Sequence, residues 1–250
     1  MKILYYIYQI CIALPILLVL TILTAIVTIV GSLLGGAHFW GYYPGKIWSQ
    51  LICLFLLIPV KIEGREKLHD KTSYIFVPNH QGSFDIFLIY GFIGRNFKWM
   101  MKKSLRKLPF VGKACESAGQ FLDRSVPKST GDHSASKRFT ERRGILSRFP
   151  EGARTFTGHM GYFKKGAFQL ADDLQLAVVP VTIDGSFEIL PRTGKWIHRH
   201  RMILTIHDPI PPKGKGMENI KATMAEAYAA VESALPEQHK GMVKNEDQDR

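Results

Sequence analysis

Charged side chains are missing from the beginning of this 250-residue chain. Residues 3–45 contain none, and the first acidic residue is Glu63. Within this stretch, residues 11–35 are dominated by Leu, Ile, Val, Ala and Thr, and a helix needs about 20 such residues to cross the hydrocarbon core of a bilayer. A cleaved secretory signal is disfavoured, because the run is too long and only one lysine precedes it. The sequence therefore predicts a membrane-embedded helix at the beginning of the chain.

A second apolar run covers residues 47–60 and is too short to cross a bilayer unaided. Aromatic side chains that favour the membrane–water interface lie near the junction of the two runs: Trp40, Tyr42, Tyr43 and Trp48. Two arrangements remain open. Either the first helix spans the bilayer and the second lies in the interface, or both form a hairpin dipped into one leaflet. The basic residues that begin at Lys61 favour a membrane-anchored protein whose globular domain faces the cytoplasm.

Cysteine is scarce, and the three cysteines, Cys11, Cys53 and Cys115, show neither a disulfide framework nor metal-ligand spacing. This is consistent with a reducing compartment. No helix-turn-helix, zinc-finger or RNA-binding signature is present, which disfavours nucleic acid as a partner. The chain is nevertheless basic, with a net charge of +12, and nearly all of its charge follows residue 60. This excess indicates an anionic lipid surface or a phosphate-bearing substrate.

From residue 61 onward, short apolar runs alternate with helix-like segments. The runs typical of strands are 74–77, 97–101, 120–122, 144–149, 176–183 and 202–207. The segments typical of helices are 84–93, 111–117, about 128–143, 166–174 and 217–234. Such alternation predicts an α/β fold with a mixed, largely parallel sheet flanked by helices. We expect a membrane anchor over residues 1–60, a globular domain over 61–235 and a disordered polar tail over 236–250.

The stretch Asn79–Asp85 lies where one strand-like run ends and the next helix-like run begins. Pro78 closes the strand, and Ser83 is expected to cap the helix, which places Asp85 in its first turn. His80 then lies at the carboxyl edge of the sheet, where open α/β sheets bind ligands. A carboxylate on one imidazole nitrogen leaves the other nitrogen able to accept a proton. The alternative is a structural loop histidine and an aspartate favoured by the helix dipole.

Two arginines also follow predicted strands, Arg124 in the segment GQFLDR and Arg154 in the segment FPEGART. Parallel strands would bring both to the same sheet edge as His80. A guanidinium offers a fork of donors that matches phosphate or carboxylate, and Gly152 allows a backbone amide to approach a ligand closely. Alternatively, the arginines form structural ion pairs. Glu151 is expected either to bind a substrate hydroxyl or to orient Arg154.

Four segments therefore occur in the order NHQGSFD, GQFLDR, FPEGART and VVPVTI. The last contains Pro180, which predicts an edge strand, a bulge or the beginning of a strand. In this order, behind an apolar leader, the segments resemble the four motifs of the glycerolipid acyltransferases, and within them the 1-acyl-sn-glycerol-3-phosphate acyltransferases. The resemblance covers residues 60–210 or so. Ala153 departs from it, because the family usually has threonine there, and the loss of that hydroxyl bears on substrate preference.

The resemblance implies transfer of a fatty acyl group from acyl-CoA or acyl-carrier protein to the sn-2 hydroxyl of lysophosphatidate, giving phosphatidate. It matches His80 to a general base and Asp85 to the residue that orients it. The residues that it matches to substrate binding are Arg124, Glu151, Gly152, Arg154 and, less directly, Lys102. Because a thioester is already activated, we expect no cofactor, metal or covalent acyl-enzyme. The expected partners are membrane lipid and the two substrates, without nucleic acid.

Other functions remain open at this point. The acceptor could be a lyso-ornithine lipid, an acylglycerol or another lysophospholipid. A thioesterase, or a non-catalytic membrane protein that binds anionic lipid, is a different class. The absence of a Gly-x-Ser-x-Gly elbow argues against a serine hydrolase of the α/β-hydrolase type. A nucleophilic Ser83 is disfavoured, because His80 would have to reach it across a tight turn.

Overall fold

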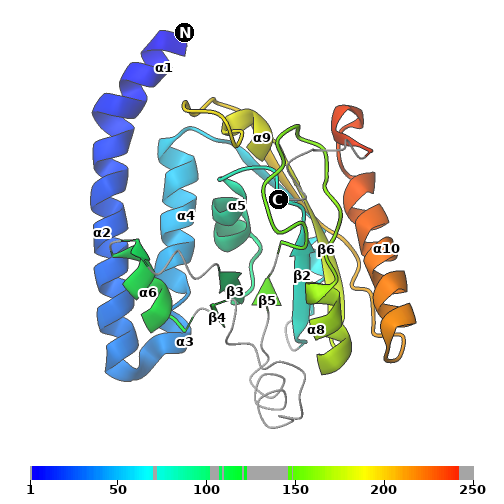
Figure 1. Ribbon diagram of the computed structural model, residues 1–250. Coiled ribbons are helices and arrows are strands. Elements are labelled where there is room, and N and C mark those ends of the chain that lie inside the picture. Colours follow the sequence, from blue (N-terminus) through cyan, green and yellow to red (C-terminus); the bar gives the residue numbers. More distant parts are fainter. Residues whose placement is uncertain are drawn as a thin grey trace.

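The computed structural model describes residues 2–69, 72–101, 107–108, 110–119, 121–122, 146–147 and 149–241 (Figure 1). The strands are β1 (Val60–Glu63), β2 (Tyr74–Pro78), β3 (Lys98–Met101), β4 (Phe121–Leu122), β5 (Leu146–Ser147), β6 (Ala177–Asp184) and β7 (Met202–Ile206). The helices are α1 (Lys2–Tyr8), α2 (Leu14–Gly31), α3 (Ala37–Trp40), α4 (Tyr43–Phe55), α5 (Asp85–Phe92), α6 (Val111–Ser117), α8 (Gly166–Leu174), α9 (Ser186–Ile189) and α10 (Met217–Ser233). Wider turns at Gln9–Ala13 and Ser32–Gly36 join the first three helices, and short 3-10 turns lie at Arg65–Lys67 and Glu237–His239.

The described strands form one seven-stranded sheet in the order β1-β7-β6-β2-β5-β3-β4. Neighbouring strands are parallel, except that β6 and β7 are antiparallel. The predicted mixed, largely parallel sheet is therefore confirmed. The helix expected over residues 128–143 lies outside the described residues. Strand β1 was not expected, because Val60–Glu63 carries only two apolar side chains and borders the preceding apolar run.

Pro180 lies in the middle of β6, between β7 and β2. Val178 pairs with Ile210, whereas Val181 pairs with Ile206. Two residues of β6 therefore face three residues of the neighbouring segment, which is a β-bulge. The carbonyl of Pro180 accepts a backbone N–H on that side, so the missing N–H of the proline falls where the ladder is already interrupted. Of the three possibilities that proline raised, the bulge is the one observed.

Side chains of β2 alternate between two hydrophobic cores. Tyr74 and Phe76 point into the core shared with α4 and α5, while Ile75 and Val77 point into the core shared with α8 and α10. Figure 1 shows these two helix layers on opposite sides of the sheet. Because β2 is buried on both faces, its sequence is a continuous apolar run. The rigid strand ends at Pro78, directly before the loop that carries His80.

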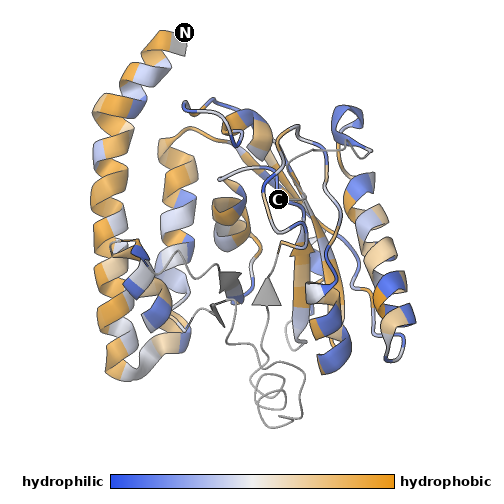
Figure 2. Cartoon of the chain, viewed as in Figure 1, coloured by the Kyte–Doolittle hydropathy of each residue, from blue (hydrophilic) through white to orange (hydrophobic). Residues whose placement is uncertain are grey.

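The N-terminal helices lie beside this fold and present an apolar outer surface (Figure 2). By length and composition, the helical run Ile3–Trp40 is long and apolar enough to cross a membrane. Helix α4 returns antiparallel to α2 and packs between α2 and α5. Ile52 and Cys53 of α4 belong to the same core as β2 and α5. The second apolar run is thus a helix that the sheet domain shares with the anchor.

Residues 236–241, expected to belong to a disordered tail, are ordered. His239 is buried, with Nε2 3.3 Å from Glu188 Oε1. Its ring also packs on Gly158, where an added Cβ would lie 2.7 Å from His239 Nε2. The expectation is wrong for these six residues, because their contacts come from segments far away in the sequence. Residues 242–250 lie outside the described part.

Candidate active site

The loop between β2 and α5 carries His80 at the carboxyl edge of the sheet, as expected from the sequence. Helix α5 begins at Asp85 after Phe84, and no side chain caps it. The expectation that Ser83 caps the helix is therefore wrong. Instead, the Ser83 hydroxyl accepts a hydrogen bond of 2.5 Å from Arg154 Nη1, which joins this loop to the segment after β5.

His80 and Asp85 form a direct hydrogen bond, with 2.6 Å between Nδ1 and Oδ2. The Asp85 carboxylate is completely buried, whereas the His80 side chain keeps 16% of its surface exposed. The backbone N–H of Gly82 donates to the same oxygen over 3.0 Å. A buried carboxylate held in this way fixes the imidazole with its proton on Nδ1 and leaves Nε2 as the basic nitrogen.

Aromatic and amide side chains fix the position of this loop. The His80 ring stacks on Phe149, with 3.8 Å between ring centroids and 12° between planes, and Trp99 also stacks on Phe149, with 5.4 Å between centroids. The Asn79 amide donates to the Ile183 carbonyl over 2.9 Å and accepts its N–H over 2.7 Å. Sequence reasoning did not assign roles to Asn79, Phe149 or Trp99. A polar Asn79 directly after a continuous apolar strand was the available signal.

Gly82 has no room for a larger residue. An added Cβ would lie 2.6 Å from the Ser186 hydroxyl and 2.7 Å from its carbonyl oxygen. Helix α9, which begins at Ser186, therefore presses against the turn between His80 and Asp85. This close approach explains glycine in the segment NHQGSFD.

Glu151 lies beneath the loop and is almost fully buried. Its Oε1 accepts the N–H of His80 over 2.7 Å, and its Oε2 accepts the N–H of Gly161 over 2.8 Å. Burial raises the pKa of Glu151 to about 8, the Asp85 carboxylate adds to the rise, and the two N–H donors oppose it. Both carboxylate oxygens thus bind backbone, and the carboxylate braces the His80 loop against the segment 158–163.

Gly152 and Arg154 follow on the same segment. Gly152 has a φ of +80°, which favours glycine, and an added Cβ there would lie 3.1 Å from Lys164 Nζ. The Arg154 guanidinium donates to the Ser83 hydroxyl. The backbone carbonyl of Arg154 accepts a 3.3 Å hydrogen bond from the Arg192 guanidinium. Cationic groups are therefore concentrated near the His80 loop. Arg124 and Lys102, the other two expected substrate-binding residues, lie outside the described residues, and their roles stay predictions.

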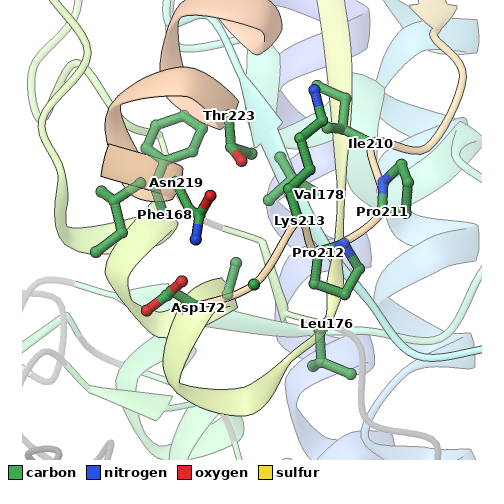
Figure 3. Close-up of a pocket in the computed structure, with 13 residues that line it drawn as sticks. Phe168, Asp172, Leu176, Val178, Ile210, Pro211, Pro212, Lys213, Asn219 and Thr223 are labelled. Carbon is green, nitrogen blue, oxygen red and sulfur yellow. The ribbon is translucent and has the colours of Figure 1, made fainter. Parts of the chain in front are cut away.

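A separate hollow lies between α8, α10 and the segment Ile210–Gly214 (Figure 3). It is lined mainly by apolar side chains and prolines, with Asp172, Lys213 and Asn219 at its rim. None of the candidate site residues lines it. Among the described residues, no group of three or more histidine, cysteine or acidic side chains is placed to hold a metal ion. The candidate active site is the His80 loop, which carries the hydrogen-bonded His80–Asp85 pair.

The Acyltransferase family model matches residues 59–184, about half of the chain and all four segments singled out above. The chain belongs to the Acyltransferase family. Within this acyltransferase, the matched region begins just before β1 and ends with β6. It contains the His80–Asp85 pair, Glu151 and Arg154.

Two curated relatives are named as 1-acyl-sn-glycerol-3-phosphate acyltransferases. LPAT1 of Arabidopsis thaliana, a chloroplastic protein, is 34% identical over 68% of this chain and 48% of the relative. The enzyme of Saccharomyces cerevisiae is 32% identical over 74% of this chain and 62% of the relative. The chain thus spans about half to three fifths of these relatives.

One solved structure resembles the acyltransferase over nearly its whole length. It is the crystal structure of the 1-acyl-sn-glycerophosphate (LPA) acyltransferase PlsC from Thermotoga maritima. The TM-score is 0.73 at 26% identity, and the match covers 92% of this chain and 95% of that chain. The match therefore includes most of the N-terminal helical segment as well as the sheet domain.

Proposed function

We propose that this acyltransferase moves a fatty acyl group from a thioester donor to the sn-2 hydroxyl of lysophosphatidate, giving phosphatidate. The observation that carries the proposal is the 2.6 Å hydrogen bond between His80 Nδ1 and the fully buried Asp85. No described residue bonds His80 Nε2, which is therefore available to a substrate. The names of the relatives support lysophosphatidate as the acceptor.

In the proposed reaction, the sn-2 hydroxyl oxygen of lysophosphatidate attacks the thioester carbonyl carbon. His80 Nε2 accepts the proton of that hydroxyl during the attack. The new C–O bond forms, the tetrahedral intermediate collapses, and the C–S bond breaks. The imidazolium then returns its proton to the departing thiolate. Buried Asp85 stabilises the imidazolium while the positive charge exists. Acyl-CoA and acyl-carrier protein present the same thioester, and either serves as donor in this scheme.

We propose Arg154, the Gly152 amide, Arg124 and Lys102 as the groups that bind the acceptor phosphate and glycerol. The contact between Arg154 and Ser83 supports the first of these, because it holds a guanidinium beside the turn that carries His80. Glu151 is assigned a different role from the substrate contact expected from the sequence. With both oxygens on backbone N–H groups, it positions His80.

We propose that residues 1–60 anchor the enzyme in one membrane leaflet, with the sheet domain on the cytoplasmic side. Within the helical run Ile3–Trp40, the part before the kink at Gly35 is about 48 Å long at 1.5 Å per residue, well beyond a hydrocarbon core of about 30 Å. The domain touches the run near both ends, through Trp196 on Tyr6 and Ala118 beside Gly41. If the helix crossed the bilayer, these two contacts would lie on opposite sides of it, and the domain that makes both would have to pass through the hydrocarbon core. A helix within one leaflet therefore fits better.

The test uses purified protein with acyl-CoA and measures thiol release with and without lysophosphatidate. An acyltransferase releases thiol only with the acceptor and forms phosphatidate in equal amount. Thiol release that does not need the acceptor would show a thioesterase instead. No thiol release from acyl-CoA or from acyl-carrier protein, with lysophosphatidate, monoacylglycerol or other lysolipids, would leave a lipid-binding protein as the function.

A further inference from the structure

The segment between α9 and β7 carries a concentrated, exposed basic surface, of which only Arg192 contacts the described part of the site. Residues 191–201 have the sequence PRTGKWIHRHR, with four lysines or arginines, two histidines and no acidic residue. All of the basic side chains are exposed. Trp196 lies in the middle of the segment, and 51% of its surface is exposed. We call residues 191–201 the basic loop.

The basic loop packs against the beginning of the N-terminal helical segment. Trp196 contacts the ring of Tyr6, with 5.2 Å between centroids, and His198 Nδ1 lies 3.1 Å from the Tyr6 hydroxyl. The Gln9 amide donates to the Ile197 carbonyl over 2.8 Å. These contacts hold the loop beside α1, as Figure 1 shows for the yellow segment between α9 and β7.

The neighbouring surface of α1 is apolar. Exposed side chains there include Ile3, Leu4 and Ile7, and Figure 2 shows the hydrophilic loop beside the hydrophobic helix. The rings of Tyr6 and Trp196 are in contact where the apolar helix meets the basic loop. Tryptophan and tyrosine prefer the boundary between acyl chains and headgroups. Moving outward from the helix, the surface is first apolar, then aromatic and then basic. A membrane leaflet changes in the same order, from acyl chains through the boundary to anionic headgroups.

We propose that the basic loop is a docking surface for the anionic headgroups of a phospholipid bilayer. Lys195, Arg199 and Arg201 contact the headgroups, and Trp196 inserts at the boundary. The loop sets the depth at which the enzyme lies and gives it a preference for anionic membranes. The inference rests on the membrane placement proposed above, but not on the acyl-transfer reaction.

The first test compares binding of the full-length protein to two kinds of vesicle. One is phosphatidylcholine alone, and the other is an equal mixture of phosphatidylcholine and phosphatidylglycerol. The apolar helices contribute to both, so the ratio of the two partition coefficients isolates the electrostatic part. One cation near an anionic surface is worth about 5-fold in partitioning. Lys195→Gln/Arg199→Gln/Arg201→Gln should lower the ratio by up to about 100-fold, and high salt should lower the wild-type ratio in the same way.

A matched control removes the same charge from the other side of the sheet. Lys213 and Lys215, just before α10, and Lys221 within it are exposed, on the side opposite the N-terminal helices. Their replacement by glutamine should leave the ratio near the wild-type value. Arg199 also donates a hydrogen bond to the Leu57 carbonyl, which the triple variant would lose. The double variant Lys195→Gln/Arg201→Gln removes two of the charges and keeps this hydrogen bond. An equal fall in the control and loop variants would overturn the proposal, since net charge alone would then explain binding.

The second test locates the loop directly. Tryptophan fluorescence is measured in vesicles whose phosphatidylglycerol carries brominated acyl chains, for the wild type and for Trp196→Phe. The proposal expects a smaller quenched fraction in the variant, because Trp196 lies at the level of the upper acyl chains. Identical quenching in both proteins would overturn it. Weak binding of the wild type to neutral vesicles, by contrast, would contradict the proposal that residues 1–60 anchor the protein. It would not contradict the proposed role of the basic loop.

Discussion

At the scale of single residues, His80 is held by three contacts, two to its imidazole ring and one to its backbone. Asp85 holds Nδ1, Phe149 covers one ring face, and Glu151 holds the backbone N–H. Each contact leaves Nε2 unoccupied among the described residues. Because 16% of the side-chain surface is exposed, this nitrogen is open to water or to a substrate. It is the nitrogen that the proposed reaction uses for proton transfer.

Replacement of His80 by alanine should lower the turnover rate at least about 100-fold, the lower end for loss of a general base. The variant leaves the buried Asp85 carboxylate without its imidazole partner, so its melting temperature should fall, and turnover is compared per folded molecule. The measurement is phosphatidate formation at saturating substrates, together with the melting temperature. His69→Ala, an exposed histidine in the same domain, is the control. Near-normal turnover in the His80 variant would contradict the mechanism.

Arg154→Ala should raise the KM for lysophosphatidate more than it lowers kcat, because a phosphate contact acts equally in ground state and transition state. A charge-assisted hydrogen bond is worth about 1.5–3 kcal/mol, or roughly 10- to 150-fold in affinity. Arg154→Lys keeps the charge without the fork and should recover only part of the loss. Activity on monoacylglycerol, which lacks the phosphate, is the internal control. Equal losses on both acceptors would show that Arg154 does not bind phosphate.

Glu151 should make stability depend on pH. Burial raises its pKa from 4.5 to about 8, so folding favours the protonated carboxyl. The free energy of unfolding should therefore fall as the pH rises from about 4.5 to about 8. Denaturant titrations across this window should show a shallower slope for Glu151→Gln than for the wild type. Glu218→Gln, on the exposed first turn of α10, is the control and should keep the wild-type slope. If Glu151→Gln also kept that slope, the pKa of Glu151 would not be raised in the folded protein.

At the scale of elements, local patterns predicted most of what was observed. Val111–Ser117 and Gly166–Leu174 are helices with the expected bounds, because each has its own apolar periodicity and breakers. The contact of His80 with Asp85 was also predictable, since a tight turn joins them. Strand β1, the bond from Glu151 to the His80 N–H and the docking of His239 were not predicted. Each depends on a partner from a distant part of the chain, which no local pattern reveals.

The C-terminal segment 236–241 offers a test of such a distant contact. Gly158 has a φ of +88° and lies against His239. Gly158→Ala should destabilise the fold by about 1–2 kcal/mol from the left-handed backbone alone, plus the clash with the imidazole. In a His239→Ala background the clash with the imidazole disappears and only the 3.3 Å approach to Phe187 remains, so the same glycine substitution should cost less. Thermal unfolding of the two single variants and the double variant measures this coupling. Strictly additive costs would show that His239 does not rest on Gly158.

At the scale of the whole molecule, the anchor and the sheet domain share one helix. Tyr42 contacts Phe97 and Tyr90, and Ile52 and Cys53 of α4 cover α5. A chain that began at residue 61 would remove this cover and expose the core shared by α5 and β2. We therefore expect that the chain can be truncated just before Tyr42 without loss of folding. Such a truncation would remove membrane binding alone.

Two truncations test this arrangement. A chain that begins at residue 42 keeps α4, so it should fold with a single cooperative transition while its partitioning into phosphatidylcholine vesicles falls sharply. A chain that begins at residue 61 should aggregate or unfold at a lower temperature, because α5 and β2 lose the apolar surface that α4 buries. Vesicle sedimentation and thermal unfolding measure the two properties separately. If the longer truncation folds as well as the shorter one, α4 belongs to the membrane anchor alone. If the chain from residue 42 binds neutral vesicles as strongly as the full chain, α1 and α2 are not the anchor, because α4 and the sheet domain then suffice for membrane binding.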